Sequence, residues 1–336
     1  MIAITGGGTG GHLKIAKVIK DELNKRGIKP IFIGSTKGAD REWFLEDRGF
    51  SEKYFLNSSG IVNKKGLKKI TSLKNIISLS FKAQKILKRH NIKAVFSVGG
   101  FSAAPASLGA LFSNIPLFIH EQNAHTGTLN RLLKPFSKRF FNTFLYNDPY
   151  PVEEIFFESA RVRKEIKTVI FLGGSQGALG INNFALKIAP ILNKKGIKII
   201  HQSGKKDFNR VKEFYKKEKI QADVFDFDKN LAKKIASADF AISRAGASTL
   251  FELASNQIPT LFIPYPYAAK DHQYKNASYI IKKAGGLLRR ENELSLDIIE
   301  EIFSLNLKDI SQKLATINKK DGAKIIIDEV MDVLSI

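Results

Sequence analysis

Short apolar runs alternate along the chain with longer segments in which apolar residues recur at helical spacing. The first run covers residues 1–5, and Leu13, Ala16, Ile19 and Leu23 then fall on one face of a predicted helix. Further strand-sized runs, bounded by Gly and Pro, lie at 30–34, 94–98, 116–120, 168–172, 197–201, 222–227, 239–243 and 259–263. This alternation predicts an α/β protein with parallel sheets covered on both faces.

The two halves of the chain repeat one scheme. Each opens with a strand, a glycine-rich loop and a helix, first as ITGGGTGGH at 4–12 and then as IFLGGSQGA at 170–178. The join near 148–163 contains two prolines followed by charged residues, which is typical of a linker. We therefore expect two Rossmann-like, doubly wound domains with ligands at the carboxyl ends of their strands, and these ends opposed across a cleft.

Composition excludes several kinds of chemistry. A chain of 336 residues with 43% hydrophobic content is long enough for two domains. It has no Cys and no HExxH motif, so disulfides, thiolate chemistry and a zinc site are not expected. No signal peptide is visible, and no apolar run is long enough to span a bilayer, which points to the cytoplasm.

The positive charge is concentrated in the first half. The net charge is +22, and no Asp or Glu occurs between Glu52 and Glu121. Either an AT-rich genome inflates the lysine content, or this half presents a surface to nucleic acid or anionic lipid. Segment 61–89 mixes lysines with apolar residues and is expected to be an interfacial element, a helix pair packed on the first domain, or both on different faces. Its apolar members are Leu67, Ile70, Leu73, Ile76, Ile77, Leu79 and Phe81.

The first glycine loop, GGGTGGH at 6–12, presents backbone N–H groups and a helix start to an anion. Its glycines also satisfy GxGxxG, but a dinucleotide site would need an acid at the end of the second strand, where Gly34, Ser35 and Thr36 stand instead. No GxxxxGK[ST] motif supports a P-loop. His12, at the mouth of the loop, is a candidate proton acceptor.

A second anion site is predicted at SRAGASTLFE, 243–252. Small residues at a helix start suit a diphosphate, and Glu252, one turn inside, can accept hydrogen bonds from two ribose hydroxyls. Downstream, Gln273 and Asn276 offer amides that suit sugar hydroxyls. The plainer alternative is an ordinary strand-to-helix turn with loop hydrogen bonds.

Together these blocks resemble the MurG family. The resemblance is carried, in order along nearly the whole chain, by GGGTGGH, SVGGFSAAP, HEQNAHTGTLN, FLGGSQGALGIN, SRAGASTLFE and DHQYKNA. It implies transfer of N-acetylglucosamine from UDP-GlcNAc to lipid-linked muramoyl-pentapeptide (lipid I), which makes lipid II for peptidoglycan. It also implies the glycosyltransferase-B architecture and an inverting reaction without a metal or another cofactor.

The resemblance assigns the nucleotide sugar to the second domain. Uracil is expected at the backbone of Phe227 and Asp228, although an Asp is unusual at 228. Arg163 matches a nucleotide-packing Arg, but Ser159, Ala160 and Arg161 replace the usual Asn-Pro lead-in, so Arg161 is an alternative. The other positions implied to bind this substrate are Ser175, Gln176, Arg244, Gly246, Ala247, Ser248, Thr249, Glu252, Gln273 and Asn276.

The first domain is implied to hold the acceptor. Its matching positions are Thr9, Gly10, Gly11, His12, Glu121, Asn123 and Asn130. Phe101 stands where the family usually has Tyr, so a hydroxyl contact there would be lost. His12 is expected to be the base that takes the proton from the acceptor's C4 hydroxyl; Glu121 is the alternative base, and a purely binding or packing role for His12 is a third interpretation.

A rival motif occurs at Asp226–Asp228, which spells DxD, a pattern that holds a divalent cation in other glycosyltransferases. The helix start at 246–249, Ser175 and an Arg already supply positive potential to departing UDP, so no metal is expected.

The expected organisation is an acceptor- and membrane-associating domain at 1–160, a UDP-GlcNAc domain at 161–320 and a C-terminal helix at 321–336 that packs back on the first domain. The acceptor's lipid tail implies a peripheral enzyme on the cytoplasmic face of the bacterial inner membrane, docked on anionic lipid. The alternatives are another UDP-sugar-dependent glycolipid glycosyltransferase or a basic nucleic-acid-binding protein. Nucleic acid is not expected as a partner, because aromatics do not interleave with the basic run.

Overall fold

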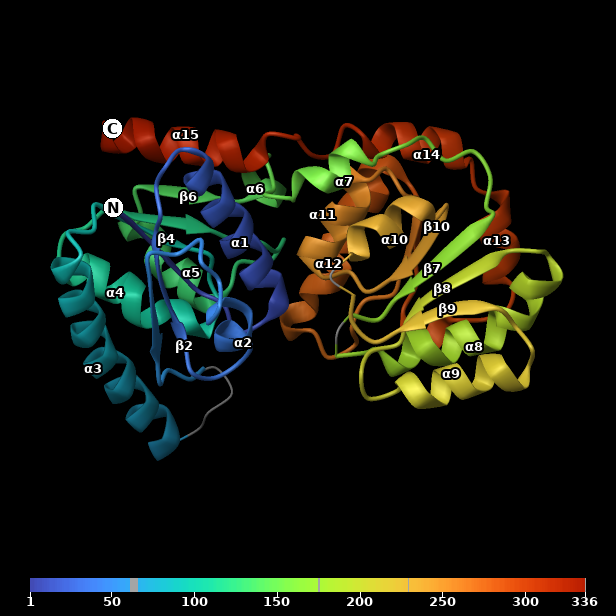
Figure 1. The fold of residues 1–336 in the computed structure, drawn as a ribbon, viewed down its shortest axis with the longest axis horizontal. Coiled ribbons are helices and arrows are strands. Elements are labelled where there is room, and N and C mark those ends of the chain that lie inside the picture. Colours follow the sequence, from blue (N-terminus) through green and yellow to red (C-terminus); the bar gives the residue numbers. More distant parts are fainter. Residues whose placement is uncertain (61–65, 175, 229, 336) are drawn as a thin grey trace. The chain divides into compact units, whose positions relative to one another are not determined.

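The computed structural model describes residues 1–60, 66–174, 176–228 and 230–335, without the side chains of Leu67 and Lys68. The chain forms two compact units (Figure 1). Unit 1 comprises Met1–Pro151 and Asp321–Ile336, and unit 2 comprises Val152–Lys320. The division falls before residue 160, because the helix α7 (Glu154–Glu158) packs within unit 2, where Asn256 Nδ2 donates to the Phe156 carbonyl over 3.0 Å.

Unit 1 contains a six-stranded sheet in the order β3-β2-β1-β4-β5-β6. All neighbouring strands are parallel, and Ile4 in the central strand pairs with Phe32 on one side and Phe96 on the other. The strands are β1 (Ile2–Thr5), β2 (Ile31–Ser35), β3 (Glu52–Leu56), β4 (Ala94–Ser97), β5 (Leu117–His120) and β6 (Arg139–Phe141). The order reverses between β1 and β4, which makes their carboxyl ends a topological switch point.

Helices cover both faces of this sheet (Figure 1). They are α1 (Gly10–Lys25), α2 (Asp40–Phe44), α3 (Leu67–Arg89), η1 (Phe101–Ala103), α4 (Ala104–Phe112), α5 (Thr128–Leu133), η2 (Lys134–Phe136), α6 (Thr143–Tyr146) and α15 (Gly322–Leu334). The residues predicted to form the apolar face of the first helix, Leu13, Ala16, Ile19 and Leu23, are all buried in α1. The C-terminal helix α15 contacts α1.

Unit 2 repeats this topology with the order β12-β11-β10-β7-β8-β9, again with all neighbouring strands parallel. Its strands are β7 (Thr168–Leu172), β8 (Lys198–Gln202), β9 (Ala222–Phe225), β10 (Phe240–Ser243), β11 (Thr260–Phe262) and β12 (Leu287–Leu288). Its remaining helices are α8 (Leu179–Lys194), α9 (Phe208–Lys217), α10 (Leu231–Ser237), α11 (Ala247–Ser255), η3 (Ala269–Asp271), α12 (His272–Ala284), η4 (Glu291–Glu293), α13 (Ile298–Ser304) and α14 (Leu307–Leu314). Here the switch point lies between β7 and β10.

The predicted α/β class and duplicated Rossmann-like scheme are confirmed, and every strand expected from an apolar run is present. The strands without a prediction are β3, β6 and β12, which all lie at sheet edges. Edge strands need less apolar character: β3 is mostly half-exposed, and β6 and β12 are only 3 and 2 residues long. In the described part of the chain, none of the helices is long and apolar enough to cross a membrane.

Candidate active site

Two glycine motifs meet at the switch point of unit 1. The loop after β1 and the loop after β4 are joined by a hydrogen bond of 3.1 Å from Gly7 N–H to the Gly99 carbonyl. Gly7 and Gly100 both have positive φ, and a Cβ on Gly100 would collide with the Gly7 carbonyl oxygen. Only glycine fits so close a backbone contact, which explains why both motifs need their glycines.

His12 lies in the first turn of α1, beside this loop. Thr9, the residue before the helix, has extended backbone, and its Oγ1 lies 2.9 Å from His12 Nδ1. In the tautomer in which Nδ1–H donates to Thr9 Oγ1, Nε2 is the nitrogen that can accept a proton. Thr9, Gly10, Gly11 and His12 are thus brought together at one helix start, and Thr9 orients the ring.

A buried carboxylate that the sequence did not single out fixes the same loop. Asp40, at the start of α2, is fully buried and accepts hydrogen bonds from Gly8 N–H and, over 2.9 Å, from Ser35 N–H. Burial raises the pKa of Asp40 above its ordinary value. A dinucleotide site needs its acid at the end of the second strand, whereas Asp40 comes after that strand and its carboxylate binds the glycine loop.

Glu121 and its neighbours form a closed cluster after β5. The Glu121 carboxylate accepts from Asn123 N–H at 3.0 Å, Gly127 N–H at 2.8 Å and Asn130 Nδ2 at 3.0 Å. Asn142 Nδ2 in turn donates to the Asn123 carbonyl over 3.0 Å. Glu121, Asn123 and Asn130 are therefore brought together as expected, but in an arrangement that favours loop support over proton abstraction.

His120, directly before Glu121, is a further candidate site residue that the sequence analysis missed. It ends β5, is completely buried, and stands edge-on to Tyr150 with ring centroids 5.4 Å apart. Burial, and to a smaller extent the charge of His12, lowers the pKa of His120 to about 3, so its ring is neutral. Neither ring nitrogen has a hydrogen-bond partner among the described residues, and the same holds for Asn130 Oδ1 and Thr143 Oγ1. A histidine directly before the glutamate of HEQN was the available signal.

The corresponding switch point in unit 2 brings GGSQGA beside SRAGAS. Arg244 N–H, after β10, donates to the Leu172 carbonyl at the end of β7 over 3.3 Å. Gly173 and Gly174 N–H groups donate to the backbone and side-chain oxygens of Gln202 at 3.3 and 3.1 Å. Gln176 is exposed in this loop, and Ser175 lies outside the described residues.

The start of α11 faces open space. Gly246 precedes the helix, no side chain caps the helix through this residue, and a Cβ added to it would meet nothing within 4 Å. Ala247, Ser248 and Thr249 form the first turn, whose N–H groups point out of the helix end. Together with the helix dipole, these N–H groups give positive potential at the helix start beside Gly246, although Ala247 and Ser248 themselves are buried.

Three predicted side chains surround this helix start in different ways. Asn276 Nδ2 donates to the Ala245 carbonyl over 3.2 Å, so this amide supports the turn before α11. Gln273 Oε1 accepts from Tyr265 N–H over 2.9 Å, which leaves its Nε2 hydrogens as the donors it can offer a sugar. Glu252 lies on the second turn of α11 and is 4% exposed.

The predicted uracil position, Phe227 and Asp228, follows the carboxyl end of β9, which lies at the same end of the sheet as the carboxyl ends of β7 and β10. Phe227 is exposed, and Asp228 accepts from Asn230 N–H at 2.7 Å and pairs with Lys234 at 3.6 Å. Asp226 accepts from Phe227 N–H. Within the described ranges, no three His, Cys, Asp or Glu side chains are grouped so that they could hold a metal ion.

Arg163 and Arg161 occupy the opposite edge of unit 2. Arg163 is fully buried and donates to the carbonyls of Ala238 and Asn256, which precede β10 and β11. Burial lowers the pKa of Arg163 to about 9. Arg161 pairs with Asp239 at 2.6 Å. The amino-terminal edge of the sheet is the wrong end for the predicted ligand site, so this geometry favours a structural role for both arginines over the expected nucleotide contact.

Arg244 lies at the carboxyl end of the sheet, where the ligand site is predicted, but its side chain binds neighbouring parts of unit 2. Its guanidinium donates to the carbonyls of Ile263 and Pro264, both at 3.1 Å, and pairs with Glu291. It thereby ties the end of β10 to the end of β11, beside the start of α11.

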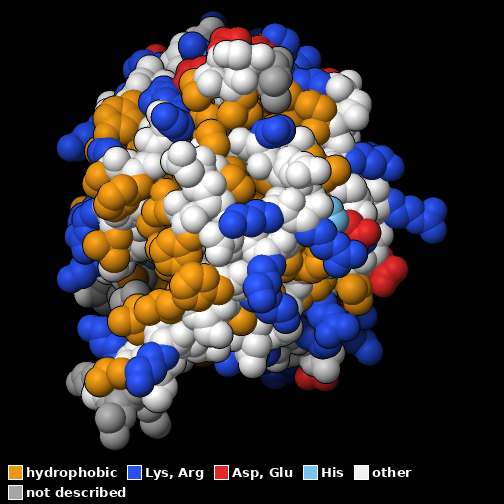
Figure 2. Space-filling model, turned by 90° about the vertical axis from the view of Figure 1, so that its left-hand side faces the viewer, with side chains coloured by type: hydrophobic (Ala, Val, Ile, Leu, Met, Phe, Trp, Pro, Cys, Tyr) orange, Lys and Arg blue, Asp and Glu red, His pale blue; other side chains and the backbone are white. Residues whose placement is uncertain are grey.

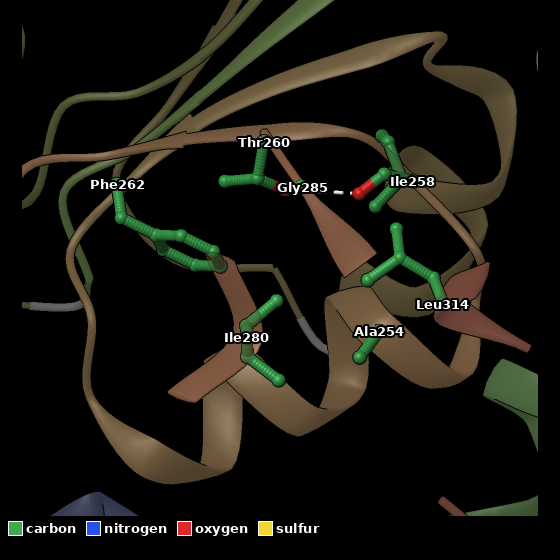
Figure 3. A pocket seen from close by; sticks show the side chains of 7 residues that line it. All are labelled: Ala254, Ile258, Thr260, Phe262, Ile280, Gly285 and Leu314. Atoms are coloured by element: carbon green, nitrogen blue, oxygen red, sulfur yellow. Dashed lines mark hydrogen bonds between the residues drawn. The ribbon is translucent and has the colours of Figure 1, made fainter. Parts of the chain in front are cut away.

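A small pocket elsewhere in unit 2 does not fit a nucleotide sugar (Figure 3). It lies between α11, α12, α14 and β11, and most of the side chains that line it are apolar. The hydroxyl of Thr260, at the first residue of β11, donates to the Ile258 carbonyl over 3.0 Å. The residues that line the pocket do not belong to β7, β10 or the turns that follow these strands, so the pocket lies away from the switch point. It reflects packing between helices.

The fold and the matched domains place the chain among the glycosyltransferases of family 28. Residues 2–142 match the family's N-terminal domain, and residues 168–330 match its C-terminal domain. The structure is similar to the crystal structure of Acinetobacter baumannii MurG, with a TM-score of 0.79 over 99% of both chains at 24% identity. It is also similar to the UDP-GlcNAc 2-epimerase of Neisseria meningitidis bound to UDP-GlcNAc, with a TM-score of 0.65 over 98% of this chain and 99% of the other at 16% identity.

Sequence relatives narrow the assignment within this family of glycosyltransferases. They are named UDP-N-acetylglucosamine--N-acetylmuramyl-(pentapeptide) pyrophosphoryl-undecaprenol N-acetylglucosamine transferase. One from Campylobacter jejuni is 52% identical over 332 residues, covering 98% of this chain and 97% of the relative. One from Nitratiruptor is 53% identical over 327 residues, 97% of each chain. The chain belongs to this family of N-acetylglucosaminyltransferases, the MurG family.

Proposed function

We propose that the enzyme transfers N-acetylglucosamine from UDP-GlcNAc to the C4 hydroxyl of undecaprenyl-pyrophosphoryl-MurNAc-pentapeptide, converting lipid I into lipid II. The names of its relatives support both substrates. The observation that carries the donor assignment is the meeting of two strand-to-helix turns, Gly173–Gly177 and Arg244–Gly246, at the switch point of unit 2. Such a point is where open α/β sheets bind ligands.

In this proposal the donor diphosphate lies at the open start of α11. The N–H groups of Ala247, Ser248 and Thr249 and the helix dipole attract its charge, and the glycine loop after β7 closes on it. Glu252 takes the ribose hydroxyls, the backbone at Phe227 and Asp228 takes uracil, and Gln273 offers its Nε2 hydrogens to the sugar. No divalent cation is needed, because backbone groups already supply the positive potential.

The chemical step is a single inverting displacement. His12 Nε2 takes the proton from the acceptor's C4 hydroxyl while that oxygen forms its bond to C1 of the donor sugar. The C1–O bond to UDP breaks, and the pair of electrons leaves with the diphosphate, whose charge the α11 start stabilises. Thr9 holds the ring so that Nδ1–H is satisfied and Nε2 is the basic nitrogen.

The direct test is turnover of labelled UDP-GlcNAc with lipid I in detergent micelles. We expect a disaccharide product with inverted anomeric configuration and full activity in EDTA after desalting. Loss of activity in EDTA with rescue by Mg²⁺ or Mn²⁺ would restore Asp226 and Asp228 as metal ligands. Turnover of UDP-GlcNAc with another glycolipid, but none with lipid I, would favour the alternative transferase.

We further propose that unit 1 docks peripherally on anionic lipid at the cytoplasmic face of the membrane. One face of α3 is buried through Ile76, Ala83 and Leu87, and the helix packs along α4. A second face carries an exposed stripe at helical spacing, Ile70, Leu73, Ile77 and Phe81, and Phe112 of α4 stacks on Phe81 with ring centroids 5.4 Å apart. Figure 2 shows hydrophobic side chains gathered on this side of unit 1 among Lys and Arg.

The charge around this apolar stripe suits anionic lipid. Residues 53–120 include no Asp or Glu, and Lys69, Lys74, Lys82, Lys85 and Lys88 are exposed on α3. Each lysine near such a surface contributes about 1 kcal/mol, and exposed apolar side chains add burial at the interface. Lys64 and Lys65, which belong to the same basic run, lie outside the described residues.

Vesicle co-sedimentation tests this docking. We expect binding to phosphatidylglycerol vesicles, weak binding to phosphatidylcholine vesicles and partial release at high salt, because salt screens only the electrostatic share. Replacing Leu73 and Phe81 by Ser should remove the binding that survives high salt. Leu296→Ser, an exposed apolar residue of unit 2, is the matched control and should have no effect. Equal binding to both kinds of vesicle would refute the proposal.

A further inference from the structure

The described residues of the glycine loop of unit 2 contact the end of the neighbouring strand β8. Gly173 and Gly174 donate the two hydrogen bonds to Gln202 described above. In addition, Gly177 packs so closely against Gly204 that a Cβ on either glycine would collide with its surroundings. A Cβ on Gly177 would come within 2.7 Å of the Ser203 carbonyl oxygen. Gly177 N–H also closes a turn onto the Gly174 carbonyl over 2.9 Å. The position of the loop therefore depends on how firmly residues 202–204 are fixed.

A buried chain of polar side chains fixes them. Asn182 on α8 is fully buried, and its Nδ2 donates to the Ser203 carbonyl at 3.0 Å and to Asp207 Oδ2 at 2.7 Å. His201 Nε2 lies 3.1 Å from Asn182 Oδ1, and His201 Nδ1 lies 3.0 Å from the Tyr215 hydroxyl. Asn182 thus connects the helix that follows the glycine loop with the strand end that supports it.

The protonation pattern of this chain follows from counting donors and acceptors. The Ser203 carbonyl and the Asp207 carboxylate can only accept, so both Asn182 Nδ2 hydrogens face them and Asn182 Oδ1 is an acceptor. His201 must then carry its proton on Nε2, and its Nδ1 accepts from the Tyr215 hydroxyl. Burial lowers the pKa of His201 to about 3 and raises that of Tyr215, which keeps both groups neutral in this pattern.

We propose that Asn182 is a positioning residue for the donor-diphosphate loop, held in its orientation by His201 and Tyr215. This inference rests on the proposed function, because it takes Gly173, Gly174, Gln176 and Gly177 as part of the diphosphate-binding element. In unit 1 a different buried polar residue also fixes a glycine loop to the end of a neighbouring strand. There, Asp40 binds both the loop after β1 and the end of β2. A displaced loop would lose donor binding while the acceptor groups of unit 1, which belong to a separately folded unit, stay intact.

The test uses the full-length enzyme, with UDP binding by calorimetry and separate KM values for donor and acceptor. Asn182→Ala should raise the UDP Kd and the donor KM about tenfold or more, with the acceptor KM within about twofold of the wild type. His201→Phe should do the same. His201→Gln should restore near-wild-type donor KM, because a glutamine can accept from Tyr215 and donate to Asn182.

A control separates positioning from simple destabilisation. Ile188→Ala removes core volume from the same helix α8 without touching the polar chain. It should lower the melting temperature and leave the donor KM unchanged. If Asn182→Ala and His201→Phe both keep the wild-type donor KM, or if His201→Gln is as impaired as His201→Phe, the positioning role is refuted. A wild-type enzyme that binds no UDP would instead refute the proposed function.

Discussion

At the residue scale, the contacts of the two candidate bases differ. The Glu121 carboxylate accepts three hydrogen bonds from its own loop, and protonating this carboxylate would weaken them. Thr9 Oγ1 lies 2.9 Å from His12 Nδ1, and this contact orients the ring. This geometry favours the prediction that His12 is the base and that Glu121 supports its loop.

His12→Ala should lower kcat by about 10²–10⁴-fold, the usual contribution of a general base, and leave UDP affinity unchanged. The measurement is kcat at saturating acceptor together with calorimetric UDP binding. Thr9→Val, which keeps the base but removes the ring's partner, should cost less. A loss below about tenfold in His12→Ala would place the base elsewhere and make Glu121 the first candidate.

His120 predicts a pH dependence of stability in unit 1. Its pKa is lowered to about 3 by burial, and secondarily by His12, whereas an unfolded histidine titrates near 6.5. Between these values the unfolded chain binds one more proton than the folded chain. The His120 contribution to the free energy of unfolding therefore falls by about 1.4 kcal/mol for each pH unit below 6.5.

His120→Phe isolates this effect. Phenylalanine keeps a ring against Tyr150 and removes two buried nitrogens that have no hydrogen-bond partner in the part of the chain that the structure describes. The variant should therefore be at least as stable as the wild type at pH 7 and lack that share of the slope. Urea unfolding followed by Trp43, the only tryptophan of the chain, reports on unit 1. Identical slopes in variant and wild type between pH 5 and 6.5 would contradict the lowered pKa.

At the scale of elements, the helix start of α11 makes a prediction that separates folding from binding. Gly246 has φ −64°, which any residue adopts, and a Cβ there meets nothing within 4 Å. Gly246→Ala should therefore cost at most about 1 kcal/mol of stability. If the diphosphate lies there, the methyl group displaces it, and the donor KM should rise severalfold while the melting temperature falls by no more than about 2–4 °C. An unchanged donor KM would move the diphosphate away from this turn.

The strand-to-helix turns were predictable because their sequence signal is local. Glycines, small residues and the onset of helical periodicity at 6–12, 173–178 and 243–252 suffice to place a turn and a helix start. The supports of these turns were not predictable, because they come from elsewhere in the chain: Asp40 reaches Gly8, and Gln202 reaches Gly174. Likewise, Arg163 resembles a ligand residue in sequence, yet its neighbours Ala238 and Asn256 place it at the other end of the sheet.

At the scale of the whole molecule, duplication was the most informative pattern. Both sheets have the same strand order, and each switch point carries a glycine loop, as the two repeated motifs predicted. The edge strands β3, β6 and β12 escaped prediction because β3 is mostly half-exposed and the other two are only 3 and 2 residues long, whereas the edge strand β9 was predicted from its apolar run. The C-terminal segment is assigned to the unit that opens the chain, so unit 1 is made of two stretches far apart in sequence.

The helix α15 should therefore stabilise unit 1 and leave unit 2 unaffected. Ile326, Ile327 and Val330 are buried, and Arg26 of α1 pairs with Asp328 at 2.8 Å and donates to the Lys324 carbonyl at 3.2 Å. Burying three such side chains contributes about 1.5–3 kcal/mol each. An enzyme truncated after Lys320 exposes the facing side of α1 and should lose much of the stability of unit 1.

Two probes on one sample measure this selectivity. Trp43 fluorescence follows unit 1 on heating, and calorimetry with UDP follows unit 2. The truncated enzyme should show a Trp43 transition lowered by about 10 °C or more, because a domain of this size loses about 2–4 °C per kcal/mol, while its UDP affinity stays at the wild-type value. Ile326→Ala in the full-length chain should reproduce a smaller part of the shift. Equal loss of the Trp43 transition and of UDP binding would mean that α15 supports both units, which contradicts the division seen here.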